Sequence, residues 1–127
     1  MTIESVADLV TEHEISTSEP ISLRDLALAT ANEYVSLILQ DKGDPITNPT
    51  LVQVADSPLR GKVSRTGYSF SIENSPIFEI YGGHGTFNPL ALQNYFIVRP
   101  CSKNQYVTAN LAIAVSNLTA RLNTEIP

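Results

Sequence analysis

Cysteine, histidine and basic residues are scarce in this sequence of 127 residues. Cys101 is its one cysteine, which excludes an internal disulfide and a cysteine-based metal cage. Eight lysines and arginines stand against 13 aspartates and glutamates, so the formal net charge is −5. Because acidic proteins repel nucleic-acid phosphates, this balance argues against nucleic-acid binding. A chain without disulfides is typical of a reducing compartment, and we expect a cytoplasmic protein.

Long apolar runs are absent as well. No segment reaches the roughly 20 unbroken apolar residues that cross a bilayer, and residues 1–4 (MTIE) lack the basic start of a signal peptide. The sequence therefore predicts no membrane association. With 43% hydrophobic residues, the chain still has enough apolar side chains for one core, at the length of one domain. We expect a single domain over residues 1–127.

Two helices are predicted in the N-terminal third of the chain. Residues 3–13 place apolar side chains on one stripe, but a helix this short is marginal in water unless it docks onto a partner. We therefore expect residues 1–21 to form a peripheral helix and a linker used in assembly. The second helix begins after Ser22, a favourable N-cap, with Asp25 three positions later at the positive end of the helix dipole. Gly43 is typical of the position that follows a helix end.

After the second helix the apolar residues recur with a period of two, which is typical of strands. Residues 51–54 and 61–64 predict two short strands, and the alternation over residues 68–81 predicts an antiparallel hairpin. The continuous apolar run of residues 95–98 predicts a central strand that is covered on both faces.

The last helix is predicted after Ser102, whose spacing to Gln105 is that of a capping box. Apolar side chains then recur at helical spacing as far as Leu122. Together these elements predict an α+β protein with a mostly antiparallel sheet of four or five strands. Two N-terminal helices and one C-terminal helix are expected to pack on that sheet.

A glycine-rich loop that carries one of the two histidines follows the predicted hairpin. Histidine titrates near neutral pH, and glycines allow backbone amides to approach a bound anion. These properties predict a ligand-binding loop made of Tyr81, Gly82, Gly83, His84, Gly85 and Asn88. His84 is the candidate acid or base, and Glu79 is the nearest carboxylate in the sequence. The glycine spacing matches neither the Walker phosphate loop nor the dinucleotide-binding fingerprint.

One basic cluster is present, formed by Arg60, Lys62 and Arg65, and it predicts a patch that binds a partner protein. A metal site is not expected, because His13 and His84 lie far apart in the sequence and the Glu12-His13-Glu14 run lacks the helical i, i+4 spacing of metal ligands. We expect no cofactor.

Two functions remain open from the sequence. The leading hypothesis is a small non-enzymatic protein-binding module (an adaptor, a chaperone-like or a regulatory protein) that forms homo-oligomers. It is favoured because apolar helical surface is abundant, whereas ionisable residues rarely cluster. The alternative is a small-ligand binder or an acid/base enzyme that uses the Gly82–Asn88 loop with His84.

Overall fold

A computed structural model describes residues 12–41, 59–83 and 87–124 of the chain. This part of the chain forms five strands and two helices. In chain order the elements are β1 (His13–Ser22), α2 (Leu23–Asp41), β2 (Leu59–Val63), β3 (Tyr68–Ile72), β4 (Ser75–Gly82), β5 (Leu92–Pro100) and α3 (Gln105–Leu122).

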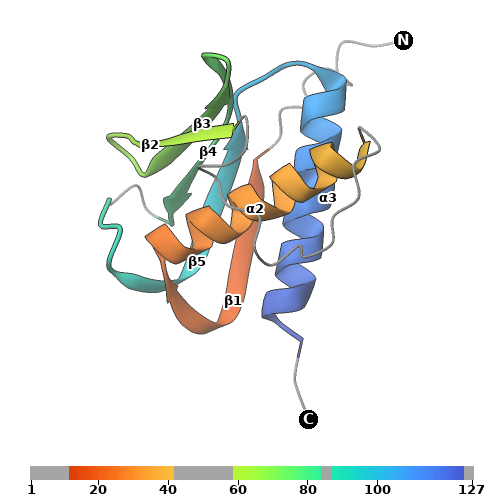
Figure 1. The fold of residues 1–127 in the computed structure, drawn as a ribbon. Coiled ribbons are helices and arrows are strands. Elements are labelled where there is room, and N and C mark those ends of the chain that lie inside the picture. The colour runs from red at the N-terminus through yellow and green to blue at the C-terminus, as the bar shows by residue number, and fades with distance from the viewer. Residues whose placement is uncertain (1–11, 42–58, 84–86, 125–127) are drawn as a thin grey trace, which may run out of the picture.

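The strands form one sheet in the order β1-β5-β4-β3-β2, and every neighbouring pair is antiparallel (Figure 1). The predicted α+β class with an antiparallel sheet is therefore confirmed. The hairpin of β3 and β4 turns through Glu73 and Asn74, whose φ angles are 50° and 69°. A two-residue turn with two positive φ angles matches the right-handed twist of its strands. The predicted strand at residues 51–54 lies outside the described residues.

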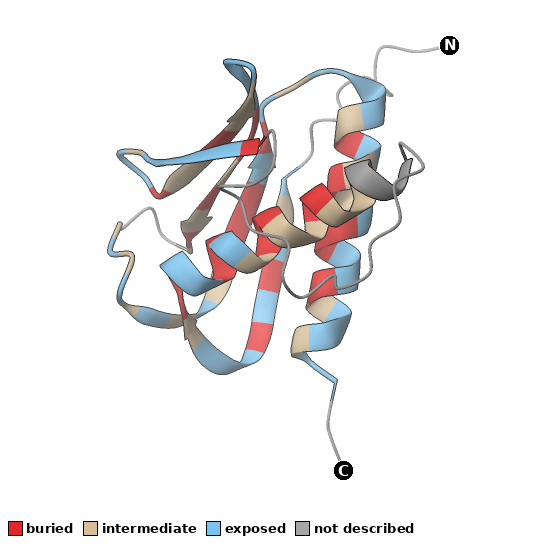
Figure 2. Ribbon diagram, in the orientation of Figure 1, coloured by how far each residue is buried: buried red, intermediate tan, exposed pale blue. Residues whose placement is uncertain are grey.

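Both described helices pack against the same face of the sheet. In Figure 1, α2 crosses the strands obliquely and α3 lies near β1. One core cluster contains alternate residues of the strands together with the inner sides of the helices, among them Ile15, Leu26, Phe70, Phe78, Ile80, Phe96, Val98, Leu111 and Leu118. Figure 2 shows the buried residues along the sides of α2 and α3 that meet each other and the sheet.

Aromatic rings fill the centre of this core. The Phe70 and Phe78 rings stack with centroids 4.8 Å apart, and Tyr34 meets Phe78 edge-on at 6.0 Å. Phe78 of β4 is fully buried. Its ring contacts both α2, through Tyr34, and β3, through Phe70.

The N-terminal region differs from the sequence prediction. Residues 13–21, expected to be the end of a helix and a linker, belong to the edge strand β1, and residues 3–11 of the expected helix lie outside the described residues. Ile15 and Thr17 are buried between exposed neighbours, which is the period of a strand. The described residues thus contain one helix near the N-terminus rather than two, and the segment predicted as a linker is a strand because it pairs with β5.

The two helix starts show one correct prediction and one correction. The Ser22 hydroxyl accepts a hydrogen bond from the Asp25 amide at 3.1 Å, so Ser22 caps α2 as predicted. At α3 the cap is Asn104, whose side-chain oxygen accepts from the amides of Tyr106 and Val107 at 2.8 and 3.2 Å. Ser102 instead accepts from the Asn104 amide at 3.0 Å and supports that cap.

Candidate functional site

The candidate site lies on the sheet face opposite the two described helices, which we call the open face. Its side chains alternate along the strands with those of the core, and none belongs to the core cluster. The strand register assigns to it Glu14, Ser16, Arg60, Lys62, Ser69, Ser71, Glu79, Tyr81, Tyr95, Ile97 and Arg99, with Glu12 just before β1.

Two tyrosines and an isoleucine form the centre of the open face. Tyr81 pairs with Ile97 across β4 and β5, and Ile97 is only 8% exposed although it lies outside the core cluster. The Tyr81 hydroxyl donates a hydrogen bond to Glu12 Oε2 at 3.2 Å. Burial and the nearby Glu12 carboxylate raise the pKa of Tyr81. The phenol is therefore a protonated donor at neutral pH.

Tyr95 lies on β5 and interacts with the second acidic residue of β1. A hydrogen bond to Glu14 is the main cause of the raised pKa of Tyr95, followed by burial. Each tyrosine of the open face is thus associated with one β1 carboxylate. This arrangement holds two aromatic rings beside an apolar side chain on adjacent strands.

An ion pair crosses from β4 to β5 beside the tyrosines. Arg99 Nη2 lies 2.9 Å from Glu79 Oε1, and the Glu79 carboxylate raises the pKa of Arg99. The Arg99 side chain is 48% exposed and that of Glu79 is 24% exposed, so the pair is accessible to a partner. Glu79, the carboxylate candidate for acid/base chemistry, is therefore paired with a permanent cation.

Cys101 lies at the end of β5, near this pair. Its sulfur is 4.0 Å from Glu79 Oε2, and burial together with the Glu79 charge raises the pKa of the thiol. A thiolate is the nucleophilic form of cysteine, so these surroundings make Cys101 a poor nucleophile at neutral pH.

The described part of the glycine loop has a packing role. A Cβ atom on Gly82 would lie 2.2 Å from Gln93 Oε1, and one on Gly83 would lie 2.7 Å from the Tyr95 ring. The Gly83 amide also donates to the Tyr95 carbonyl at 3.0 Å. These two glycines make room for side chains of β5, including a tyrosine of the open face.

The remaining residues of the predicted ligand loop contribute less to a site. Asn88 accepts a hydrogen bond from the Leu90 amide at 3.1 Å, so its side-chain oxygen shapes its own turn. His84 and Gly85 lie outside the described residues, and a ligand site there stays a prediction. Among the predicted ligand and catalytic residues, the structure brings Tyr81 and Glu79 together on the open face.

The predicted basic patch also reaches the open face. Arg60 and Lys62 share this face on β2, whereas Arg65 is exposed in the connection to β3. The acids Glu12 and Glu14 lie at the opposite edge of the sheet, on the β1 side. Charge therefore changes sign across the open face, from acidic at β1, through the Glu79–Arg99 pair, to basic at β2.

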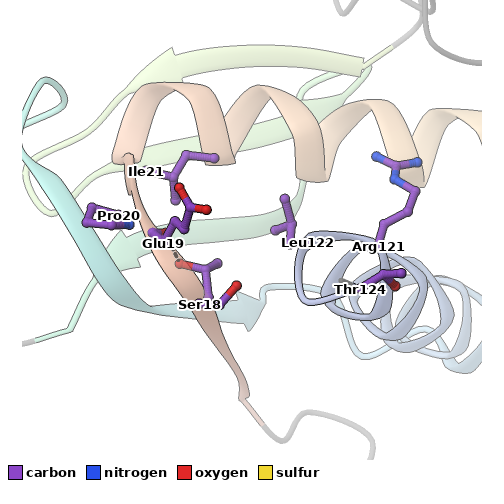
Figure 3. Close-up of a pocket in the computed structure, with 8 residues that line it drawn as sticks. Ser18, Glu19, Pro20, Ile21, Arg121, Leu122 and Thr124 are labelled. Atoms are coloured by element: carbon purple, nitrogen blue, oxygen red, sulfur yellow. Dashed lines mark hydrogen bonds between the residues drawn. The ribbon is translucent and has the colours of Figure 1, made fainter. Parts of the chain in front are cut away.

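A groove of about 780 Å³ lies between β1 and the end of α3. Figure 3 shows residues 18–21 of β1 on one side and Arg121, Leu122 and Thr124 on the other. Its walls mix polar and apolar side chains, and the one guanidinium among them, that of Arg121, forms an ion pair with Glu33 of α2. The other charged side chain of the lining is that of Glu19, which is exposed on β1.

No profile of a known protein family, no curated protein and no solved structure matches the chain. Within residues 12–41, 59–83 and 87–124, no helix is long and apolar enough to cross a membrane. The same residues contain no group of three histidine, cysteine or acidic side chains placed to hold a metal ion.

Sequence reasoning missed Glu14, Tyr95, Ile97 and Arg99 as site residues. They share one face only because β1 pairs with β5, which follows it by about 80 residues in the sequence. The alternation of Glu14 and Ser16 with buried Ile15 was the available signal, but the helical spacing before it pointed to a different element.

Proposed function

We propose that the protein is a small, non-enzymatic protein-binding module and that its binding surface is the open face of the sheet. One observation carries the proposal: Tyr81, Tyr95 and Arg99 surround Ile97 on the adjacent strands β4 and β5, outside the core that the helices cover. We further propose that the protein acts in the cytoplasm as an adaptor or a regulatory protein.

The residue types favour a protein partner. Tyrosine and arginine are enriched among the residues that contribute most to protein–protein binding, particularly around a desolvated apolar centre. Here the rings belong to paired strands, and their hydroxyl groups already interact with Glu12 and Glu14. Side chains held in this way lose little conformational entropy on binding, which increases the net affinity.

The alternative, a small-ligand binder or acid/base enzyme at the Gly82–Asn88 loop, has weaker support. Glu79 is paired with Arg99, Asn88 accepts from a nearby amide, and Gly82 and Gly83 accommodate the side chains of β5. The proposal therefore rests on the open face.

The decisive experiment is affinity purification of the full chain from its native cell with quantitative mass spectrometry, comparing wild type with Tyr95→Ala. Tyr106→Ala is the matched control, because Tyr106 is 52% exposed on α3, away from the open face. We expect the wild type and the control to recover the same partner proteins, and Tyr95→Ala to lose them. Thermal unfolding of each variant shows whether the fold is intact.

Two results would contradict the proposal. One is equal recovery of partners by folded Tyr95→Ala and wild type. The other is loss of recovery with His84→Ala alone, which would favour the glycine-loop alternative.

A further inference from the structure

We propose that a second copy of this chain covers the open face, with the two sheets stacked about a two-fold axis that runs parallel to the strands over β4. This inference rests on the proposed function, because it names the partner that binds the open face. It commits to a symmetric dimer in which the same face is used by both copies.

The geometry follows from the strand order. β4 is the middle strand of the sheet, between β5 and β3. A two-fold axis parallel to the strands and above β4 reverses the strand order of the second copy. Consequently β1 lies over the second copy's β2, β5 lies over its β3, and β4 lies over its β4. Stacked sheets of this aligned kind lie about 10 Å apart.

Charge complementarity selects this axis. The acids of the open face are on the β1 side and the bases are on β2, so each acidic edge meets the basic edge of the other copy, twice per dimer. A two-fold axis perpendicular to the strands would instead place β1 over β1, with acid against acid. Complementary electrostatic potentials on two facing surfaces fix how the surfaces align, and like charges placed opposite each other disfavour other alignments.

The strand register aligns one acid with one base. Glu79 pairs with both Arg99 and Ser69, and Ser69 pairs with Lys62, so these four residues form one row across the sheet. Continuing the pairing of His13 with Val98 by one residue places Glu12 in the same row, beside Arg99. Glu12 and Lys62 therefore stand at opposite ends of one row, and the two-fold axis brings them together.

Side-chain size is complementary in the same arrangement. β5 presents the large side chains of Tyr95, Ile97 and Arg99, whereas β3 presents Ser69 and Ser71. Because this axis keeps each row at its own level along the strands, the large Arg99 lies over the second copy's small Ser69, and the row of Tyr81 and Ile97 lies just beyond the start of the second copy's β3. At the axis, each Glu79 approaches its own symmetry copy, and the Arg99 beside each carboxylate compensates the repulsion.

The size of the face sets the expected strength of the dimer. The open face offers fewer side chains than the roughly 20–30 residues per side of a standard interface. We therefore expect a dissociation constant in the micromolar range that rises with salt, since screening weakens exposed charge pairs.

Sedimentation equilibrium of the full chain at low salt, over micromolar to sub-millimolar concentrations, tests the dimer. Glu12→Lys and Lys62→Glu should each raise the dissociation constant, on the order of tenfold, because every reversed charge acts twice across the axis. The double variant Glu12→Lys/Lys62→Glu should bind more tightly than Glu12→Lys, since it restores opposite charges and the wild-type net charge, while both of these proteins lack the hydrogen bond that Tyr81 donates to Glu12.

Matched controls separate this contact from a general effect of net charge. Glu19→Lys and Lys103→Glu make the same charge changes at exposed positions outside the open face, and they should leave the dissociation constant unchanged. A wild type that stays monomeric throughout, or a double variant that fails to regain dimerisation, overturns the inference.

If the wild type is monomeric and Tyr95→Ala still loses partner proteins, the dimer is wrong and the protein-binding function stands. If Tyr95→Ala also has no effect, both fail.

Discussion

The side-chain amide of Asn123 forms two hydrogen bonds with the backbone of β1, one on each side of Thr17. Asn123 Oδ1 accepts from the Ser18 amide at 2.8 Å, and Asn123 Nδ2 donates to the Ser16 carbonyl at 2.8 Å. The amide of one side chain thus satisfies the outer edge of β1 as a neighbouring strand would. It fixes the end of α3 to the strand that supplies the acids of the open face.

Asn123→Ala should lower the free energy of unfolding by about 1–3 kcal/mol, because two backbone groups of β1 lose their partner. Urea denaturation measures the change. Asn117→Ala is the control, since Asn117 is exposed on the same helix, and it should change stability little. Equal effects of the two substitutions would show that the Asn123 contacts with β1 do not stabilise the fold.

Phe78→Ala should be among the most destabilising single substitutions in the core. Phe78 is fully buried and contacts the rings of both Phe70 and Tyr34, so its removal leaves a cavity between α2 and the sheet. We expect a loss of about 3–5 kcal/mol in the free energy of unfolding. The same measurement on Phe87→Ala, at a half-buried ring on the margin of the core, should give a smaller loss.

The comparison of sequence and structure shows which elements local patterns can predict. The hairpin of β3 and β4 and the start of α2 depend on neighbouring residues: period-two alternation in one case and the Ser22 cap in the other. β1 depends instead on its pairing with β5, and that pairing is interrupted between Ser16 and Ile21. The interrupted segment contains Pro20, which has no amide hydrogen to donate, so its sequence resembles a linker.

The open face was harder to predict than the fold for the same reason. The sequence predicts Tyr81 and Glu79 as site residues because they lie next to the glycine loop, and Lys62 because it belongs to a basic cluster. Glu14 and Tyr95 acquire their relationship only through the register between β1 and β5. A pattern within one strand gives the face on which each side chain lies, but it does not give the strand beside it.

His13 should make stability depend on pH near neutrality. Burial lowers the pKa of His13 from its ordinary value of 6.5, so the unfolded chain binds this proton more readily than the folded protein does. His13 therefore does not affect the free energy of unfolding above about pH 6.5. As the pH falls below that value, protonation of His13 in the unfolded chain lowers the free energy of unfolding. Urea denaturation between pH 8 and pH 5 should show a decline in wild type that is smaller in His13→Gln. Identical declines in the two proteins would contradict the burial of a neutral His13.

Glu14→Gln should lower the pKa of Tyr95. The hydrogen bond to the Glu14 carboxylate is the main cause of the raised pKa, and the negative charge of Glu14 adds to it. The substitution removes the charge and weakens the hydrogen bond, so the Tyr95 phenolate forms at lower pH. NMR titration of the Tyr95 ring measures the shift. Glu19→Gln, at an exposed position of β1, should leave that pKa unchanged. An unchanged Tyr95 pKa in Glu14→Gln would mean that the carboxylate does not hold this ring on the open face. The Tyr95 ring would then not be held in place before binding, and the proposed surface would lose conformational entropy when a partner binds.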